Sequence, residues 1–74
     1  MKPKYNVGDK VYIINCSKKI QEIEITGIRK GITYKKEPIF YYGFFEPQEK
    51  YGTIYIQEEE NEVFATKEEL ITSL

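Results

Sequence analysis

Apolar and polar residues alternate along much of this 74-residue chain, a pattern typical of strands with one buried face. In the first such segment, Val7, Val11 and Ile13 share one parity and are predicted to face the core. In the second, residues 20–28, isoleucines alternate with glutamate and threonine. The parity of the isoleucines switches at Gly27, which predicts a bulge at that point.

The same reasoning predicts three further strands. Arg29-Lys30-Gly31 is predicted to form a hairpin loop, with the third strand beginning at Ile32. An aromatic strand over residues 39–45 is followed by a proline-containing turn and by a strand over residues 51–57. Val63-Phe64 is predicted to form a short closing strand.

The C-terminal residues change from strand to helix periodicity. Thr66 and Glu69 have the spacing of a capping box, which marks the start of a helix. Leu70, Ile71 and Leu74 then form one apolar stripe, which is expected to dock on the strands.

Composition supports a β-rich fold. The chain has eleven Ile, three Val, seven Tyr and four Phe, against two Leu and one Ala. β-Branched and aromatic residues favour strands, and a chain of this length has room for one domain. We therefore predict an all-β fold in residues 1–74: a small five-stranded barrel with a short C-terminal helix.

Both ends of the chain resemble known small barrels. The segment Val7-Gly8-Asp9-Lys10-Val11-Tyr12 resembles the first strand of SH3-like barrels of the KOW and Tudor type, where a Gly-Asp turn leads into an alternating strand. Residues 63–71 resemble the ending of many short uncharacterised bacterial and phage proteins, which carry a strand and a capped helix after a small barrel. This resemblance implies an SH3-like barrel and a phage or mobile-element origin. It implies no function, because such barrels serve unrelated roles.

Charge is unevenly distributed although the net charge is −1. Residues 1–38 carry nine cations and four anions, whereas residues 39–74 carry two cations and eight anions. The basic half could offer a face to an anionic partner, or the two halves could neutralise each other across the sheet. We favour neutralisation, because nucleic-acid-binding domains usually carry a clear basic excess.

The sequence offers little for catalysis. There is no histidine, and the single cysteine, Cys16, can form neither an internal disulfide nor a CxxC zinc pair. The acidic run at residues 58–62 lacks the alternating ligands and central glycine of a calcium loop. We therefore expect a non-enzymatic protein with no metal and no cofactor. No apolar run has the length of a signal peptide or a membrane span, so we expect a cytoplasmic protein with no membrane partner.

Aromatic residues concentrated between positions 40 and 55 form the main functional candidate. If Ile39, Tyr41 and Phe45 face the core, the alternate residues of that strand face outward. The predicted aromatic face then consists of Tyr12, Phe40, Tyr42, Phe44, Tyr51 and Tyr55. Such a face could bind a protein partner or a second copy of the chain, or it could be covered by the C-terminal helix.

Nucleic-acid binding is the alternative function. It would use tyrosines as stacking surfaces together with the cations Lys18, Lys19, Arg29, Lys30, Lys35 and Lys36. However, Lys18-Lys19 and Arg29-Lys30 stand at opposite ends of the predicted second strand, about 35 Å apart if that strand is straight. We therefore rank a protein-binding module first.

Overall fold

The computed structural model describes residues 2–15, 17–48, 50 and 52–74. In these ranges the chain is mostly strand with one short α-helix, as the sequence predicts. The elements in chain order are β1 (Lys10–Ile14), β2 (Ile20–Glu24), β3 (Gly27–Ile32), β4 (Pro38–Gln48), β5 (Gly52–Glu59), the 3-10 helix η1 (Glu60–Glu62) and α1 (Lys67–Thr72).

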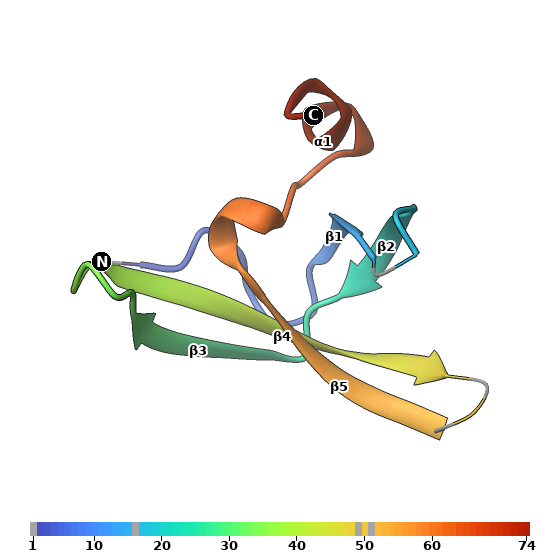
Figure 1. The fold of residues 1–74 in the computed structure, drawn as a ribbon, viewed down its shortest axis with the longest axis horizontal. Coiled ribbons are helices and arrows are strands. Elements are labelled where there is room, and N and C mark those ends of the chain that lie inside the picture. Colours follow the sequence, from blue (N-terminus) through green and yellow to red (C-terminus); the bar gives the residue numbers. More distant parts are fainter. Residues whose placement is uncertain (1, 16, 49, 51) are drawn as a thin grey trace.

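The strands form two antiparallel sheets (Figure 1). One has two strands in the order β1-β2, and the other has three in the order β3-β4-β5. The backbone N–H of Thr26, the residue before β3, donates to the carbonyl of Gly43 at 2.8 Å and so extends the β3–β4 pairing into the linker from β2. On its other side, β1 forms a single bridge between Tyr12 and Phe64.

The first strand buries Val11 and Ile13 as predicted, but Val7 is 61% exposed, so its predicted inward orientation is wrong. Gly8 has a φ of 95°, a left-handed conformation that glycine adopts without strain. This turn lies between Val7 and the start of β1, so the alternation of the strand does not extend back to Val7.

The predicted second strand is two strands. β2 ends at Glu24, and the chain then crosses to the other sheet instead of forming a bulge at Gly27. Ile25, at the crossing, is fully buried, and its N–H donates to the carbonyl of Asp9 at 2.9 Å. The crossing places this isoleucine between the two sheets, where both can pack on it.

The predicted hairpin loop at Arg29-Lys30-Gly31 is also wrong, because these residues lie inside β3. The chain turns later, between Thr33 and Glu37, with Lys36 at a φ of 62°. The Thr33 carbonyl accepts from the N–H of Lys36 at 2.8 Å, and the Thr33 hydroxyl accepts from the N–H of Glu37 at 3.2 Å. A threonine side chain thus stabilises this turn, which contains no glycine.

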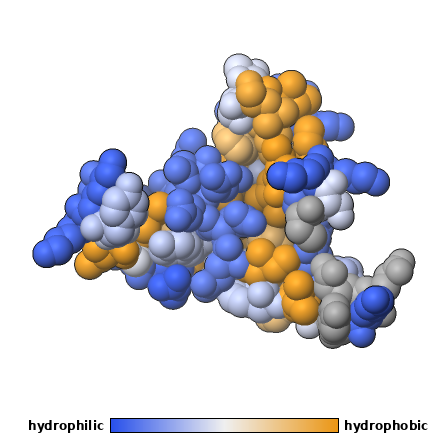
Figure 2. Space-filling model, in the orientation of Figure 1, coloured by the Kyte–Doolittle hydropathy of each residue, from blue (hydrophilic) through white to orange (hydrophobic). Residues whose placement is uncertain are grey.

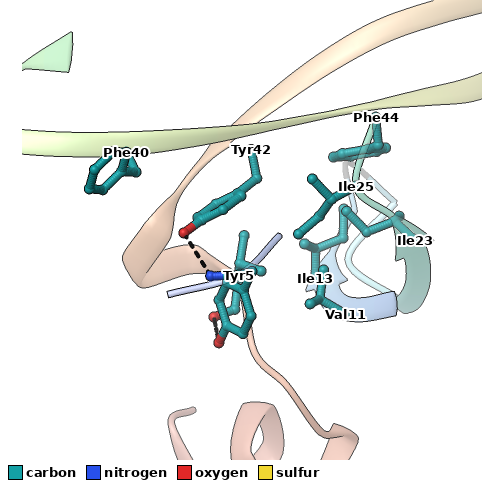
Figure 3. Close-up of a cluster of buried hydrophobic side chains, with 9 residues drawn as sticks. Tyr5, Val11, Ile13, Ile23, Ile25, Phe40, Tyr42 and Phe44 are labelled. Atoms are coloured by element: carbon teal, nitrogen blue, oxygen red, sulfur yellow. Dashed lines mark hydrogen bonds between the residues drawn. The ribbon is translucent and has the colours of Figure 1, made fainter. Parts of the chain in front are cut away.

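The core lies between the two sheets (Figure 3). Phe40, Tyr42 and Phe44 of β4 point into it, so their predicted outward orientation is wrong. They pack with Tyr5, Val11, Ile13, Ile23, Ile25 and Val63. A tyrosine can be buried here because the Tyr42 hydroxyl accepts from the N–H of Tyr5 at 3.2 Å and donates to the carboxylate of Glu60.

The C-terminal helix begins as the capping pattern predicts. The Thr66 hydroxyl accepts from the N–H of Glu69 at 3.1 Å. Only Leu70 of the predicted apolar stripe is buried, whereas Ile71 and Leu74 are exposed. The helix lies near β1 and leaves β4 uncovered (Figure 1). In the described part of the chain, no helix is both long and apolar enough to cross a membrane.

Candidate aromatic binding face

Three glycines lie on the face of β3-β4-β5 that points away from the core, where tyrosine side chains cover them. Gly27 of β3 and Gly43 of β4 are direct cross-strand partners. The Tyr55 side chain from β5 lies across both of them. A Cβ atom on Gly27 would stand 2.8 Å from the Tyr55 Oη, and one on Gly43 would overlap the Oη and Cζ atoms. The tyrosine therefore occupies space that larger residues at these two positions would fill.

A second tyrosine lies over a third glycine on the same face. A Cβ atom on Gly31 would stand 2.6 Å from Cε2 of Tyr41. Arg29, which is paired with Tyr41 in the register, places its guanidinium 4.5 Å from the centre of the Tyr41 ring. This distance is typical of a cation–π contact, which restrains the ring.

Phe45 and Tyr55 complete this face. They are cross-strand partners, with ring centres 4.9 Å apart and ring planes at 57°. Phe45 is 60% exposed and Tyr55 is 47% exposed. We use the name aromatic face for Arg29, Tyr41, Phe45 and Tyr55. No enclosed pocket was found in the described part of the chain, so this face offers a surface for contact rather than a cavity.

The aromatic face is close to electrically neutral. Arg29, Tyr41 and Glu59 form one row across the three strands, so the single cation of the face has an anion in the same row. The neighbouring row consists of Gly27, Gly43 and Gln57 and carries no charge. A partner would therefore meet mainly ring surface and backbone here.

Of the predicted aromatic face, Tyr55 alone lies on the observed one among the described residues. Phe40, Tyr42 and Phe44 are core residues, and Tyr51 lies outside the described residues.

Tyr12 belongs to the other sheet. Its hydroxyl donates to the carboxylate of Glu22 at 3.0 Å. This hydrogen bond and the charge of Glu22 raise the pKa of Tyr12. The side chain is therefore engaged within the sheet formed by β1 and β2, away from the aromatic face.

Two members of the observed face, Tyr41 and Phe45, were predicted to be buried. The hydrophobic pattern contains no signal that separates them from Phe40 and Phe44, because every residue from 39 to 45 is apolar, aromatic or glycine. The informative residue is Gly43, which has the parity of Tyr41 and Phe45. Glycine inside a strand marks a place where another group approaches the backbone closely.

The six predicted basic residues do not form one cluster. Lys18 and Lys19 lie between β1 and β2, whereas Lys35 and Lys36 lie in the turn between β3 and β4, at the opposite side of the molecule (Figure 1). Lys30 pairs with Phe40 and so points to the opposite side of β3 from Arg29. Only Arg29 belongs to the aromatic face.

The described residues also contain no group of three or more histidine, cysteine, aspartate or glutamate side chains arranged to hold a metal ion. No family model, curated protein or solved structure matches this chain. Its function must therefore be argued from the geometry of the aromatic face.

Proposed function

We propose that this chain is a non-enzymatic binding module whose aromatic face binds a protein partner. The observation that supports this most directly is the exposure of the paired rings of Phe45 and Tyr55 on a nearly neutral surface. Tyrosine and arginine are enriched in protein–protein interfaces, and exposed apolar patches on small proteins are often functional.

The face is also largely ordered before it binds. Tyr55 lies against Gly43, and Tyr41 contacts both Gly31 and Arg29. Immobilising a free side chain at an interface costs about 0.5–1.5 kcal/mol. Rings already held in place lose little of this freedom on binding, which favours their use as contact residues.

Nucleic-acid binding is the second candidate function, and the contact between Arg29 and Tyr41 favours it. Aromatic rings with a neighbouring arginine can stack on the bases of a single strand. The other cations lie elsewhere in the fold, so such binding would have little support from phosphate contacts near the face. This distribution is why we rank it second.

For the fold, we propose a small five-stranded SH3-like barrel. Two contacts support closure of the strands around one core. The Thr26–Gly43 hydrogen bond extends the β3–β4 pairing into the linker that comes from β2, and the bridge between Tyr12 and Phe64 adds a pairing on the free edge of β1. If the strands close in this way, the N–H groups of Tyr12 and Phe64 should exchange with solvent only on global unfolding.

Site-specific photo-crosslinking tests the proposed protein binding. A photoreactive phenylalanine analogue at position 45 should give a discrete crosslinked product with a protein in cells that naturally express the chain. The matched control carries the analogue at Val7, which is equally exposed but lies outside the aromatic face. Equal crosslinking from both positions, or none from position 45, would refute the proposal.

Amide NMR spectra with a mixture of single- and double-stranded oligonucleotides at low salt test the second candidate. Shifts centred on Arg29 and Tyr41 that are reversed by added salt would place nucleic-acid binding first. An unchanged spectrum would eliminate it.

A further inference from the structure

The outer edge of β5 is the longest strand edge without a partner in the described structure. In the order β3-β4-β5, β5 pairs with β4 alone over eight residues, and its register runs without a bulge from Glu59 to Gly52. No backbone hydrogen bond joins β5 to a segment other than β4 among the described residues. An edge of this kind can pair with a further strand.

The hydrogen-bonding direction at this edge follows from a contact on the far side of β4. The Gly43 carbonyl accepts from the N–H of Thr26 at 2.8 Å, so Gly43 directs its polar backbone groups toward β3. Gly43 and its β5 partner Gln57 therefore form a non-hydrogen-bonded pair. Gln57 directs its own N–H and C=O away from β4, toward the free edge. Because the N–H and C=O groups of successive strand residues point to alternate sides, those of Tyr55 and Thr53 also point toward the free edge. Thr53 fits this assignment, because it stands opposite Pro47, which has no N–H.

β5 lacks the features that usually prevent edge strands from pairing. Proteins protect such edges with lysine, proline or bulges. The stretch from Gly52 to Gln57 carries no charge and no proline, and Ile54 is 37% exposed. A small hydrophobic patch lies over the region of β4 and β5, separate from the hydrophobic side chains over α1 (Figure 2). The other edge of the sheet, β3, carries Arg29 and Lys30 and is protected by them.

The charges near the two ends of β5 favour one orientation of an incoming strand. Lys50, which is exposed, precedes the uncharged stretch by two residues, and Glu58, Glu59 and Glu60 follow it. A second β5 in antiparallel orientation places the lysine of each copy beside the glutamates of the other. A parallel arrangement would instead place glutamates opposite glutamates, which is unfavourable.

We propose that the edge of β5 pairs with β5 of a second copy of this chain, in an antiparallel register centred on Tyr55. In this register Thr53 of each copy stands opposite Gln57 of the other, and Lys50, which precedes β5, comes close to Glu59 at the far end of the other β5. The two sheets of β3-β4-β5 join into one six-stranded sheet, and the Phe45–Tyr55 pairs of the two copies become neighbours. The contact is self-complementary and closes as a dimer. It uses the backbone edge and does not depend on the aromatic face binding another protein.

Sedimentation velocity over a range of concentrations tests this proposal on the full chain. The wild type should show a reversible monomer–dimer equilibrium. Thr53→Lys places a charge inside the new strand pair, opposite Gln57 of the other copy, and should raise the dimer dissociation constant about tenfold. The matched control, Val7→Lys, adds the same charge at an exposed site away from the edge and should leave the equilibrium unchanged.

Charge reversal tests the orientation. Lys50→Glu and Glu59→Lys should each weaken the dimer by about fivefold, and the double variant should restore it. In a mixed-label NMR sample, the register centred on Tyr55 predicts an intermolecular contact between the Hα atoms of Ile54 and Ile56. A monomer at millimolar concentration, or a dimer indifferent to Thr53→Lys, would overturn the proposal. Failure of the double variant to restore the dimer, or absence of the Ile54–Ile56 contact, would overturn the antiparallel register.

Discussion

Replacing Gly43 with alanine tests whether the Tyr55 ring packs directly on the backbone of Gly43. A Cβ atom at this position would overlap the Tyr55 hydroxyl and Cζ, and would stand 3.0 Å from Cε1. The backbone of β4 is fixed on both sides by its neighbours, so we expect the ring to move. Tyr55 would then lose its place on the sheet and its contact with Phe45.

The size of this effect follows from the contacts that are lost. An aromatic pair contributes about 0.5–1.5 kcal/mol beyond its buried area. Re-exposing the buried half of the ring costs about 1 kcal/mol more. Alanine in place of glycine returns about 0.5–1 kcal/mol, because the unfolded chain has less freedom to lose. We therefore expect Gly43→Ala to lower the free energy of unfolding by about 1 kcal/mol, or the melting temperature by about 4–8 °C.

A double-mutant cycle read by urea denaturation and far-UV circular dichroism isolates the contact. Once Tyr55→Ala has removed the ring, Gly43→Ala no longer meets an obstacle and should stabilise the protein by about 0.5–1 kcal/mol. The two substitutions should therefore be coupled by about 2 kcal/mol. If Gly43→Ala has the same effect with and without the tyrosine, the ring does not rest on Gly43, and our description of the aromatic face is refuted.

Three further predictions concern single side chains. Thr66→Ala removes the cap of α1 and should lower the free energy of unfolding by about 1 kcal/mol in urea denaturation. Burial and the hydrogen bond to Glu60 raise the pKa of Tyr42 from 10.0 to about 12, so its contribution to stability is complete below pH 10 and is lost as the pH rises to 12. The stability difference between wild type and Tyr42→Phe should therefore shrink over that interval, and a constant difference would contradict the assignment. Burial and the neighbouring carboxylates of Glu62 and Glu59 raise the pKa of Glu58, so its charge opposes folding at neutral pH. Glu58→Gln should raise the melting temperature at pH 7, and this gain should vanish in acid, where the carboxyl is protonated in both the folded and the unfolded chain.

The sequence predicts burial correctly where polar residues alternate with apolar ones. Val11 and Ile13 in β1, and Ile23 and Ile25 around β2, all face the core. Val11, Ile23 and Ile25 have charged or polar neighbours on both sides along the chain, and Ile13 shares the parity of Val11. Only one face of each strand can therefore be buried without placing charged side chains in the core. The cap at Thr66 is equally local, because its hydrogen bond spans only three residues.

The orientation of β4 could not be predicted in this way. Both of its faces are aromatic over residues 39–45, so alternation does not distinguish the core side from the outer side. The choice depends on contacts that are distant in sequence. Tyr42 points inward because the N–H of Tyr5 and the carboxylate of Glu60 satisfy its hydroxyl. Neither partner can be recognised from the residues near Tyr42.

The glycines of the three-stranded sheet bear on function as well as on orientation. Gly27, Gly31 and Gly43 all lie on the outer face, and each weakens a strand by about 0.5–1 kcal/mol relative to alanine. A sheet selected for stability alone would carry β-branched residues at these positions, since such residues suit a half-buried strand. The glycines instead allow the rings of Tyr41 and Tyr55 to approach the backbone closely, while Tyr55 remains 47% exposed. These glycines reduce strand stability and produce an ordered, exposed aromatic surface. Binding explains this arrangement more readily than folding does, which supports the proposal that the aromatic face contacts a partner.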